Sequence, residues 1–321
     1  MNLLPRLLLV LSCLASSGLA VELKVVPGWP VLPEGEILGQ VSGVGVDSRG
    51  DVFVFHRGTP RPPGTDPAKA GPIQDADIVR FDGRTGKLAA RWGAGRFLYP
   101  HGLFVDSRDH VWVTDIAYHQ VFEFDRDGRL LRQWGEAGTV GADAAHFNMP
   151  TDVAVAPDGA FYVSDGYGNS RVVQFSADGK FLRQWGRRGT GPGEFNTPHG
   201  VALDAEGRVY VADRENDRLQ VFTPDGEFLA QWRSPAIGRP FGIRIGRDGL
   251  VYVTDGGEPP KIMNRSKLLV LDRTGALLAS IGRFGNQDGQ FMLAHDLAVS
   301  AEGAVFVGDI LGRRVQQFRR P

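Results

Sequence analysis

Three histidines, His101, His199 and His295, occupy the same position in alternate copies of an internal repeat. They stand in the short sequences Tyr-Pro-His-Gly, Thr-Pro-His-Gly and Leu-Ala-His-Asp. If the repeats close into a ring, this alternation spaces the three imidazoles evenly around one axis. Three neutral imidazoles with an open fourth position are the ligand set of a catalytic zinc ion. The pattern therefore predicts that these histidines bind zinc or a similar divalent metal.

The repeat has six copies, and each copy has the sequence pattern of antiparallel strands. Turn pairs such as Asp158-Gly159, flanked by alternating apolar residues, indicate β-hairpins. A second hairpin follows in most copies, and two hairpins make one four-stranded propeller blade. The copies recur roughly every 40 to 60 residues, as in propeller repeats. They begin near Gly43, Gly102, Asp152, Gly200, Gly242 and Asp296.

The two ends of the repeat array predict how the ring closes. The sixth copy stops after Phe318 and lacks an outer strand, whereas residues 23–40 precede the first copy and can supply one. We therefore predict an all-β fold, a six-bladed β-propeller whose ring is closed by an N-terminal strand. An open array or a β-sandwich is the alternative architecture.

Composition is consistent with one propeller domain over residues 21–321. The chain has 321 residues, 42% of them hydrophobic, and its 43 glycines and 20 prolines suit a turn-rich all-β protein. The net charge of −1 argues against a nucleic-acid surface. We expect a monomer with no membrane span.

Residues 1–20 resemble a secretory signal peptide. Arg6 precedes an apolar run, and Gly18-Leu19-Ala20 provides a small-residue cleavage site. We expect cleavage after Ala20 and a periplasmic or secreted protein. The single cysteine, Cys13, lies within this segment, so the mature chain would have no disulfide. A lipoprotein site at Cys13 is a weaker alternative.

Alignment of the copies brings further residues to the mouth of the central channel. The histidine position precedes the first strand of each blade, and there the odd-numbered blades have Ser42, Thr151 and Phe241. A second column, at the end of the second strand, holds five aspartates that we expect to cap the next turn, with His56 in their place in blade one. The aspartates are Asp115, Asp165, Asp213, Asp255 and Asp309.

The column that follows contains two arginines, Arg57 and Arg214. An arginine at the mouth could bind a carboxylate through two parallel hydrogen bonds, although a surface salt bridge is an equally good interpretation. One residue further on, blade three carries Tyr167, which could serve as a general base beside a metal or could simply pack.

Several segments resemble the peptidyl-α-hydroxyglycine α-amidating lyases, a family of six-bladed propellers built from NHL-type repeats. The resemblance runs from about Gly39 to Phe318 and includes residues outside the repeat consensus. It is carried by Phe55-His56-Arg57-Gly58, Tyr99-Pro100-His101-Gly102-Leu103, Pro150-Thr151-Asp152, Asp165-Gly166-Tyr167-Gly168-Asn169-Ser170-Arg171 and Asp213-Arg214-Glu215-Asn216.

The resemblance implies a role for each matching residue. His101, His199 and His295 match the zinc ligands, Tyr167 matches the catalytic tyrosine, and Arg57 and Arg214 match the arginines near the substrate. It also implies a structural calcium ion bound by the backbone carbonyls of Val44 and Leu103 and by the carboxylate of Asp296, a chemically reasonable set of oxygen ligands.

The implied activity is cleavage of the N–C bond of a peptidyl-α-hydroxyglycine, or of a related carbinolamide such as an N-acyl-α-hydroxyglycine, to an amide and glyoxylate. Zinc would lower the pKa of the substrate hydroxyl, Tyr167 would remove its proton, and an arginine would hold the substrate carboxylate. A separate hydroxylating enzyme would have to supply the substrate.

The chain departs from the family pattern at three places. Gly168 stands where the animal enzymes have a disulfide-bonded cysteine, and Leu293-Ala294 replaces Met-Pro before the third histidine. Residues 58–76 are rich in proline and glycine, lack a clear match, and are a candidate loop over the mouth. These differences bear on which substrate the site accepts.

Two other classes of function fit the sequence. One is a non-enzymatic NHL propeller that binds a peptide or protein partner, which would need neither a metal nor Tyr167. The other is a different metal-dependent propeller hydrolase, such as a lactonase, although those calcium enzymes usually present acidic and amide ligands in the channel.

Overall fold

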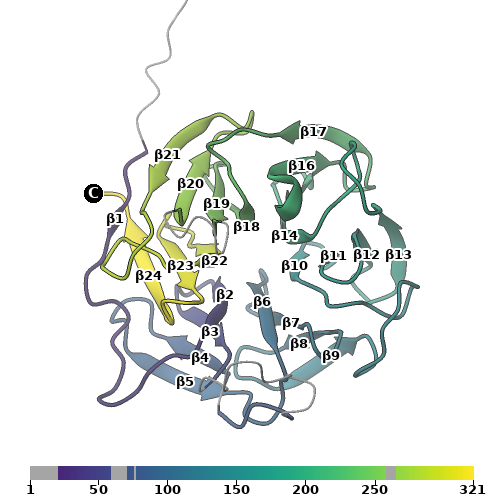
Figure 1. Ribbon diagram of the computed structural model, residues 1–321. Helices are drawn as coiled ribbons and strands as arrows, with labels where there is room; N and C mark the ends of the chain where they lie inside the picture. Colours follow the sequence, from purple (N-terminus) through teal and green to yellow (C-terminus); the bar gives the residue numbers. More distant parts are fainter. Residues whose placement is uncertain (1–20, 59–70, 76, 258–264) are drawn as a thin grey trace, which may run out of the picture.

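A computed structural model describes residues 21–58, 71–75, 77–257 and 265–321. Within these ranges the chain forms six four-stranded antiparallel sheets arranged as blades around a central channel (Figure 1). A single short 3-10 helix, Arg214–Asn216, interrupts the strands of this part of the chain. The predicted six-bladed β-propeller is therefore confirmed.

Each blade contributes one strand to each of four concentric positions. The innermost strands are β2 (Val41–Val46), β6 (Pro100–Val105), β10 (Asp152–Val155), β14 (Pro198–Leu203), β18 (Pro240–Ile245) and β22 (Ala294–Val299). The second strands are β3 (Val52–His56), β7 (Val111–Asp115), β11 (Phe161–Asp165), β15 (Val209–Asp213), β19 (Val251–Asp255) and β23 (Val305–Asp309). The third strands are β4 (Ile78–Phe81), β8 (Gln120–Phe124), β12 (Arg171–Phe175), β16 (Arg218–Phe222), β20 (Lys267–Leu271) and β24 (Arg314–Arg319). The outer strands are β5 (Leu88–Trp92), β9 (Leu130–Trp134), β13 (Phe181–Trp185), β17 (Phe228–Trp232), β21 (Leu277–Ile281) and β1 (Lys24–Val25).

The blades stack through their apolar faces. The second strands are buried along their whole length because both faces of each blade are covered by neighbouring blades. The outer strands alternate between partly buried and exposed positions or face solvent more fully. Trp134 illustrates the contact between blades, since its indole lies against the turn glycine Gly179 of the next blade and donates a 3.1 Å hydrogen bond to its carbonyl. Gly179 has a φ of 85°, which a residue with a side chain adopts only at a cost.

The N-terminal segment closes the ring, as predicted. Lys24 pairs with Arg319 and Val25 pairs with Phe318, so β1 completes the sixth blade. Trp29 follows and packs against the turn glycine of blade one, Gly86, as Trp134 packs against Gly179.

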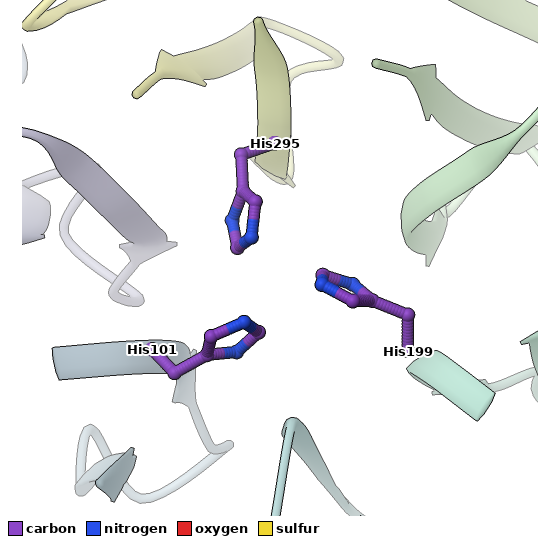
Figure 2. Close-up of side chains that lie close together, drawn as sticks. All are labelled: His101, His199 and His295. Atoms are coloured by element: carbon purple, nitrogen blue, oxygen red, sulfur yellow. The ribbon is translucent and has the colours of Figure 1, made fainter. Parts of the chain in front are cut away.

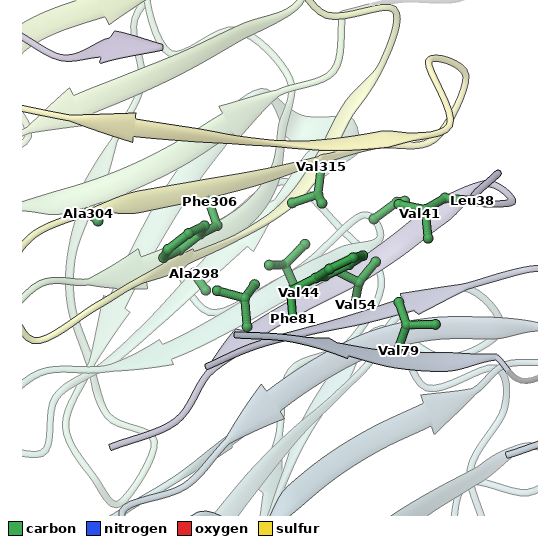
Figure 3. Close-up of a cluster of buried hydrophobic side chains, with 11 residues drawn as sticks. Leu38, Val41, Val44, Val54, Val79, Phe81, Ala298, Ala304, Phe306 and Val315 are labelled. Carbon is green, nitrogen blue, oxygen red and sulfur yellow. The ribbon is translucent and has the colours of Figure 1, made fainter. Parts of the chain in front are cut away.

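The core between blades six and one is continuous across this closure (Figure 3). It joins residues from both ends of the chain, among them Val44, Val54, Phe81, Phe306 and Val315.

Two sequence predictions concern segments that lie wholly or partly outside the described residues. The signal peptide falls on residues 1–20, and most of the candidate loop falls on residues 59–70 and 76. Export and cleavage after Ala20 remain predictions. In the ranges that the structure describes, every helix is too short and too polar to traverse a lipid bilayer.

Candidate functional site

Irregularities in the innermost strands position the three histidines. In β14, Pro198 pairs with Asp213 and Gly200 pairs with Ala212, which leaves His199 as an extra residue. His295 is the extra residue of β22 in the same way, and β6 has a register shift around His101. A bulge turns one side chain out of the regular pleat. The histidines were expected just before these strands, but they are the second residue of each strand because the ladder resumes on both sides of the bulge.

The three imidazoles come together on the channel axis, as the alternation predicted (Figure 2). Each pair of ring centroids is 4.8 Å apart, so the rings form an equilateral triangle. All three side chains are buried. The spacing by alternate blades therefore produces a three-fold arrangement.

Backbone carbonyls of the odd-numbered blades determine which ring nitrogen carries the proton. The Nδ1 atom of His101 lies 2.6 Å from the Thr151 carbonyl, and that of His295 lies 2.7 Å from the Ser42 carbonyl. The Nδ1 atom of His199 lies 3.0 Å from the Phe241 carbonyl. A carbonyl only accepts hydrogen bonds, so Nδ1 must donate and Nε2 has the free lone pair.

Burial keeps these imidazoles neutral. Loss of hydration lowers the pKa of His101 and of His199 well below the usual value, and neighbouring positive groups add to the effect. The same burial, reinforced by the charge of Arg57, lowers the pKa of His295 to about 3. Three neutral rings with free Nε2 atoms, each held by a carbonyl on Nδ1, suit the requirements of a zinc ion. His101, His199 and His295 therefore fit a zinc ion.

Tyr167 lies over this cluster. Its hydroxyl oxygen is 3.1 Å from Nε2 of His101 and 3.1 Å from Nε2 of His199. Arg214 donates to the same oxygen from Nη1, also at 3.1 Å. On its other side Arg214 is held by Glu215, which accepts from its Nε at 2.9 Å. The arrangement fixes a phenol oxygen between a cationic donor and two imidazoles.

Arg57 reaches the same mouth from blade one. Its Nε donates to the Pro100 carbonyl at 3.0 Å, and its guanidinium lies 4.1 Å from the centroid of the Tyr99 ring. Nη1 donates to Gln40 Oε1 at 3.2 Å. The structure thus brings all the candidate site residues from the histidine, arginine and tyrosine positions to one place.

A pocket of about 740 Å³ reaches the cluster at His295 and Tyr167. One part of its wall is polar and cationic, and another is apolar. Its lining residues are Gln40, Arg57, Tyr99, Ile116, Ala117, His119, Met149, Tyr167, Arg214, Arg239, Phe241, Leu293, His295, Ile310 and Leu311. The described residues of the candidate loop, 58 and 71–75, do not line it.

Sequence reasoning missed the residues that hold the two arginines. These are Tyr99 and Gln40 for Arg57, and Glu215 together with Arg239 for Arg214. Tyr99 stands two residues before His101 and Glu215 directly follows Arg214, so adjacency to a candidate residue was a usable signal for these two.

The structure shows what surrounds the two departures from the family pattern that lie near the site, Gly168 and Leu293-Ala294. A side chain at Gly168 would collide with Asn148, since a Cβ atom there would stand 2.0 Å from the Asn148 Cγ. The Ala294 N–H donates to Ser266 Oγ at 2.8 Å, a bond that a proline at this position could not make. Leu293 lines the pocket in place of the family methionine.

The strand-end aspartates have the structural role that was expected. Asp115 accepts hydrogen bonds from the N–H groups of Leu98, Tyr99, Ala117 and Tyr118, and so joins two loops. In blade one, Nδ1 of His56 replaces the carboxylate as the acceptor.

Two of the three residues expected to bind calcium, Leu103 and Asp296, contact an arginine. Arg244 Nη2 donates to the Leu103 carbonyl at 3.0 Å and lies 3.2 Å from Asp296 Oδ1. Val44 contributes its N–H, which donates to Asp296 Oδ2 at 3.0 Å. With a guanidinium on two of the three ligand groups, the residues do not fit a divalent cation.

Fold and site together define a six-bladed propeller with a buried three-histidine cluster at one mouth of its channel. The NHL repeat model matches residues 147–175 and 195–222. Among solved structures, a streptogramin B lyase is similar at 12% identity, with a TM-score of 0.60 over 94% of this chain and 98% of that one. A gluconolactonase from Xanthomonas campestris is similar at 16% identity, with a TM-score of 0.62 over 89% of this chain and 87% of that one. These two likenesses concern the fold alone.

The relatives that are similar in sequence identify the family of the chain. The chain is 33% identical to a probable peptidyl-alpha-hydroxyglycine alpha-amidating lyase of Caenorhabditis elegans, over 88% of this chain and 83% of that one. It is 37% identical to the peptidylglycine alpha-amidating monooxygenase of Rattus norvegicus, over 91% of this chain and 31% of that one. The chain thus spans about a third of the length of the latter relative. It belongs to the peptidyl-α-hydroxyglycine α-amidating lyase family.

Proposed function

We propose that this protein is a lyase that cleaves the N–C bond of a peptidyl-α-hydroxyglycine, or of a related carbinolamide, and releases an amide and glyoxylate. The observation that carries the proposal is the position of the Tyr167 oxygen, 3.1 Å from Nε2 of His101, from Nε2 of His199 and from Nη1 of Arg214. Membership of the lyase family supports the same reaction class.

The proposed metal is zinc, held by Nε2 of His101, His199 and His295. When bound there, zinc would supply Lewis-acid polarisation of a substrate oxygen. The fixed Nδ1–H bonds and the neutral rings support this assignment, because zinc binds a deprotonated imidazole nitrogen.

Tyr167 is the proposed base. Its phenolate oxygen accepts the proton of the substrate hydroxyl, the C–O bond becomes a C=O bond, and the electron pair of the C–N bond leaves with nitrogen. The nitrogen takes up a proton, which the Tyr167 hydroxyl can return, so that the products are an amide and glyoxylate. The donor from Arg214 stabilises negative charge on the Tyr167 oxygen.

Arg57 and Arg214 are the proposed partners of the substrate carboxylate. Arg57 and Arg214 both line the pocket, as do Tyr167 and His295. Their contacts with Tyr99 and Glu215 hold them in place, which reduces the entropy lost on binding.

We propose a monomeric, exported protein whose substrate is a small peptide or an N-acyl-α-hydroxyglycine made by a separate hydroxylating enzyme. The two alternative functions, a partner-binding NHL propeller and a metal-dependent hydrolase, share the fold, and the partner-binding propeller needs neither a metal nor Tyr167.

The test measures glyoxylate release from a panel of α-hydroxyglycine compounds, together with zinc content by elemental analysis. We expect about one zinc ion per wild-type chain, a large loss of zinc in His199→Ala, and unchanged zinc in His146→Ala. His146 is a suitable control because it contacts Asp143 near the surface, away from the cluster. Equal zinc in His199→Ala and the wild type would refute the metal site. A zinc-loaded wild type that releases no glyoxylate from any of these compounds would refute the lyase.

A further inference from the structure

A buried arginine occupies the central channel. Arg244 extends from β18 in blade five, and only 8% of its side chain is exposed. Its Nη1 donates to Asp152 Oδ2 at 2.8 Å, and its Nη2 donates to the Leu103 carbonyl at 3.0 Å. Nη2 also lies 3.2 Å from Asp296 Oδ1. Neither the predicted zinc site nor the proposed mechanism uses this residue.

The contacts of Arg244 and its two carboxylate partners extend to all six blades. The guanidinium itself joins blade five to blades two, three and six. Asp296 accepts the Val44 N–H of blade one at 3.0 Å, and Asp152 accepts the Val201 N–H of blade four at 3.1 Å. One cation and two carboxylates therefore link all six innermost strands into one network across the channel.

We infer that the guanidinium of Arg244 is the structural cation of this channel and that the protein binds no calcium there. A calcium ion on Leu103 and Asp296 would need the oxygen atoms that Arg244 already engages, because calcium binds oxygen at about 2.3–2.6 Å. It would also stand beside a buried positive charge, with little water to screen the repulsion. A charge that is part of the chain has the further property that dilution and chelators do not remove it.

The inference concerns the channel and does not depend on the lyase reaction. It is tested first on the zinc-loaded wild type, without substrate. We expect elemental analysis to find zinc but no calcium after dialysis against calcium-containing buffer followed by desalting. We also expect the melting temperature to be the same in calcium chloride and in sodium chloride of equal ionic strength. One calcium ion per chain, or a higher melting temperature in calcium, would overturn the inference.

Substitution of Arg244 gives the complementary test. Arg244→Ser leaves two buried carboxylates without their cation, so we expect a lower melting temperature that calcium partly restores. Arg244→Lys retains a positive charge, and we expect its melting temperature not to respond to calcium. A melting temperature of Arg244→Ser equal to that of the wild type in calcium-free buffer would contradict the structural role. If Arg244→Ser does not fold, the wild type and Arg244→Lys still decide the outcome, because a calcium response in either one overturns the inference.

Discussion

At the scale of single residues, the candidate site depends on which nitrogen of each histidine is protonated. A metal ligand needs a lone pair on Nε2, and the carbonyls of Ser42, Thr151 and Phe241 provide this by accepting from Nδ1. These three residues stand at the histidine position of the odd-numbered blades. The even-numbered blades thus supply the imidazole rings, and the odd-numbered blades orient these rings through their backbone carbonyls.

Replacement of Tyr167 tests the proposed base. Tyr167→Phe removes one hydroxyl group, so we expect the fold and the zinc content to persist while glyoxylate release falls roughly 10²–10⁴-fold. Tyr210→Phe is the matched control, because it removes a hydroxyl that contacts Asp204 away from the pocket. The measurements are steady-state glyoxylate release and zinc content by elemental analysis, both made on the two variants. Wild-type turnover by Tyr167→Phe would return Tyr167 to a packing role.

Replacement of the arginines tests carboxylate binding. A hydrogen bond to a charged group is worth about 1.5–3 kcal/mol, so we expect Arg57→Ala and Arg214→Ala each to lower kcat/KM roughly tenfold to a hundredfold for free acids. Methyl esters lack this contact, so we expect them to be poor substrates that respond little to Arg57→Ala, whereas Arg214→Ala should slow them as well because Arg214 donates to the Tyr167 oxygen. Arg187→Ala, at an exposed ion pair with Glu194, should leave both substrates unaffected. Equal losses for acid and ester in Arg57→Ala would mean that Arg57 does not bind the carboxylate.

At the scale of the elements, each blade joins its second strand to the loops at the mouth through one buried acceptor. Five blades use an aspartate, and blade one uses Nδ1 of His56, which accepts from the N–H groups of Gly39 and Gly58 at 3.3 and 3.1 Å. Protonation of this nitrogen would abolish both bonds. Burial lowers the pKa of His56 to about 4, which is consistent with a neutral acceptor.

Because blade one has His56 where the other five blades have an aspartate, we expect an acid sensitivity that is specific to blade one. With a pKa of about 4 in the folded chain and about 6.5 in the unfolded chain, His56 binds a proton first in the unfolded state. Its contribution is therefore complete above pH 6.5 and is lost as the pH falls toward 4. The loss amounts to about 3 kcal/mol. His56→Asn keeps an acceptor that does not titrate, so we expect the free energy of unfolding, measured in urea at several pH values, to fall less steeply than in the wild type. Parallel pH profiles would contradict this assignment.

At the scale of the whole molecule, the ring depends on residues from the two ends of the described chain. Leu23 is 7% exposed and packs with Phe291 and Phe318 next to the β1–β24 pair. If the ring opened at this point, the blades on either side would each lose the neighbour that covers one face. We therefore expect loss of the Leu23 contact to weaken the whole ring and not just one edge.

Leu23→Ala tests the importance of closure. We expect the free energy of unfolding to fall by about 2–5 kcal/mol, the usual cost of deleting a buried leucine side chain. Leu182→Ala, at a position that is 47% exposed on β13, is the control and should change the free energy by about 0.5 kcal/mol or less. Urea unfolding of both variants makes the comparison. Similar small losses in the two would mean that β1 contributes little to stability.

The sequence alone determined the architecture and the central cluster, for a physical reason. The alternation of apolar residues and the turn residues between them indicate a hairpin from nearby residues alone. Because this pattern recurs in six copies, the number of blades could be counted. The symmetry of the ring then converts equivalent positions along the chain into equivalent positions in space, which is why the sequence assigns His101, His199 and His295 to one axis. That a strand from residues 23–40 completes the last repeat followed from the count of strands, because one blade was incomplete; the strand is Lys24–Val25.

Only the tertiary structure decided what surrounds these residues. The bulges that place each histidine inside its strand, and the carbonyls that fix its tautomer, involve backbone atoms that leave no mark on residue type. Arg244 looked like one more polar residue on a strand, and its contacts with Leu103, Asp152 and Asp296 exist because the closed ring brings four blades together at the channel. Such contacts depend on the geometry of closure and not on spacing along the chain. The expected calcium ligands could therefore be named from the family resemblance, while the cation between Leu103 and Asp296 could not.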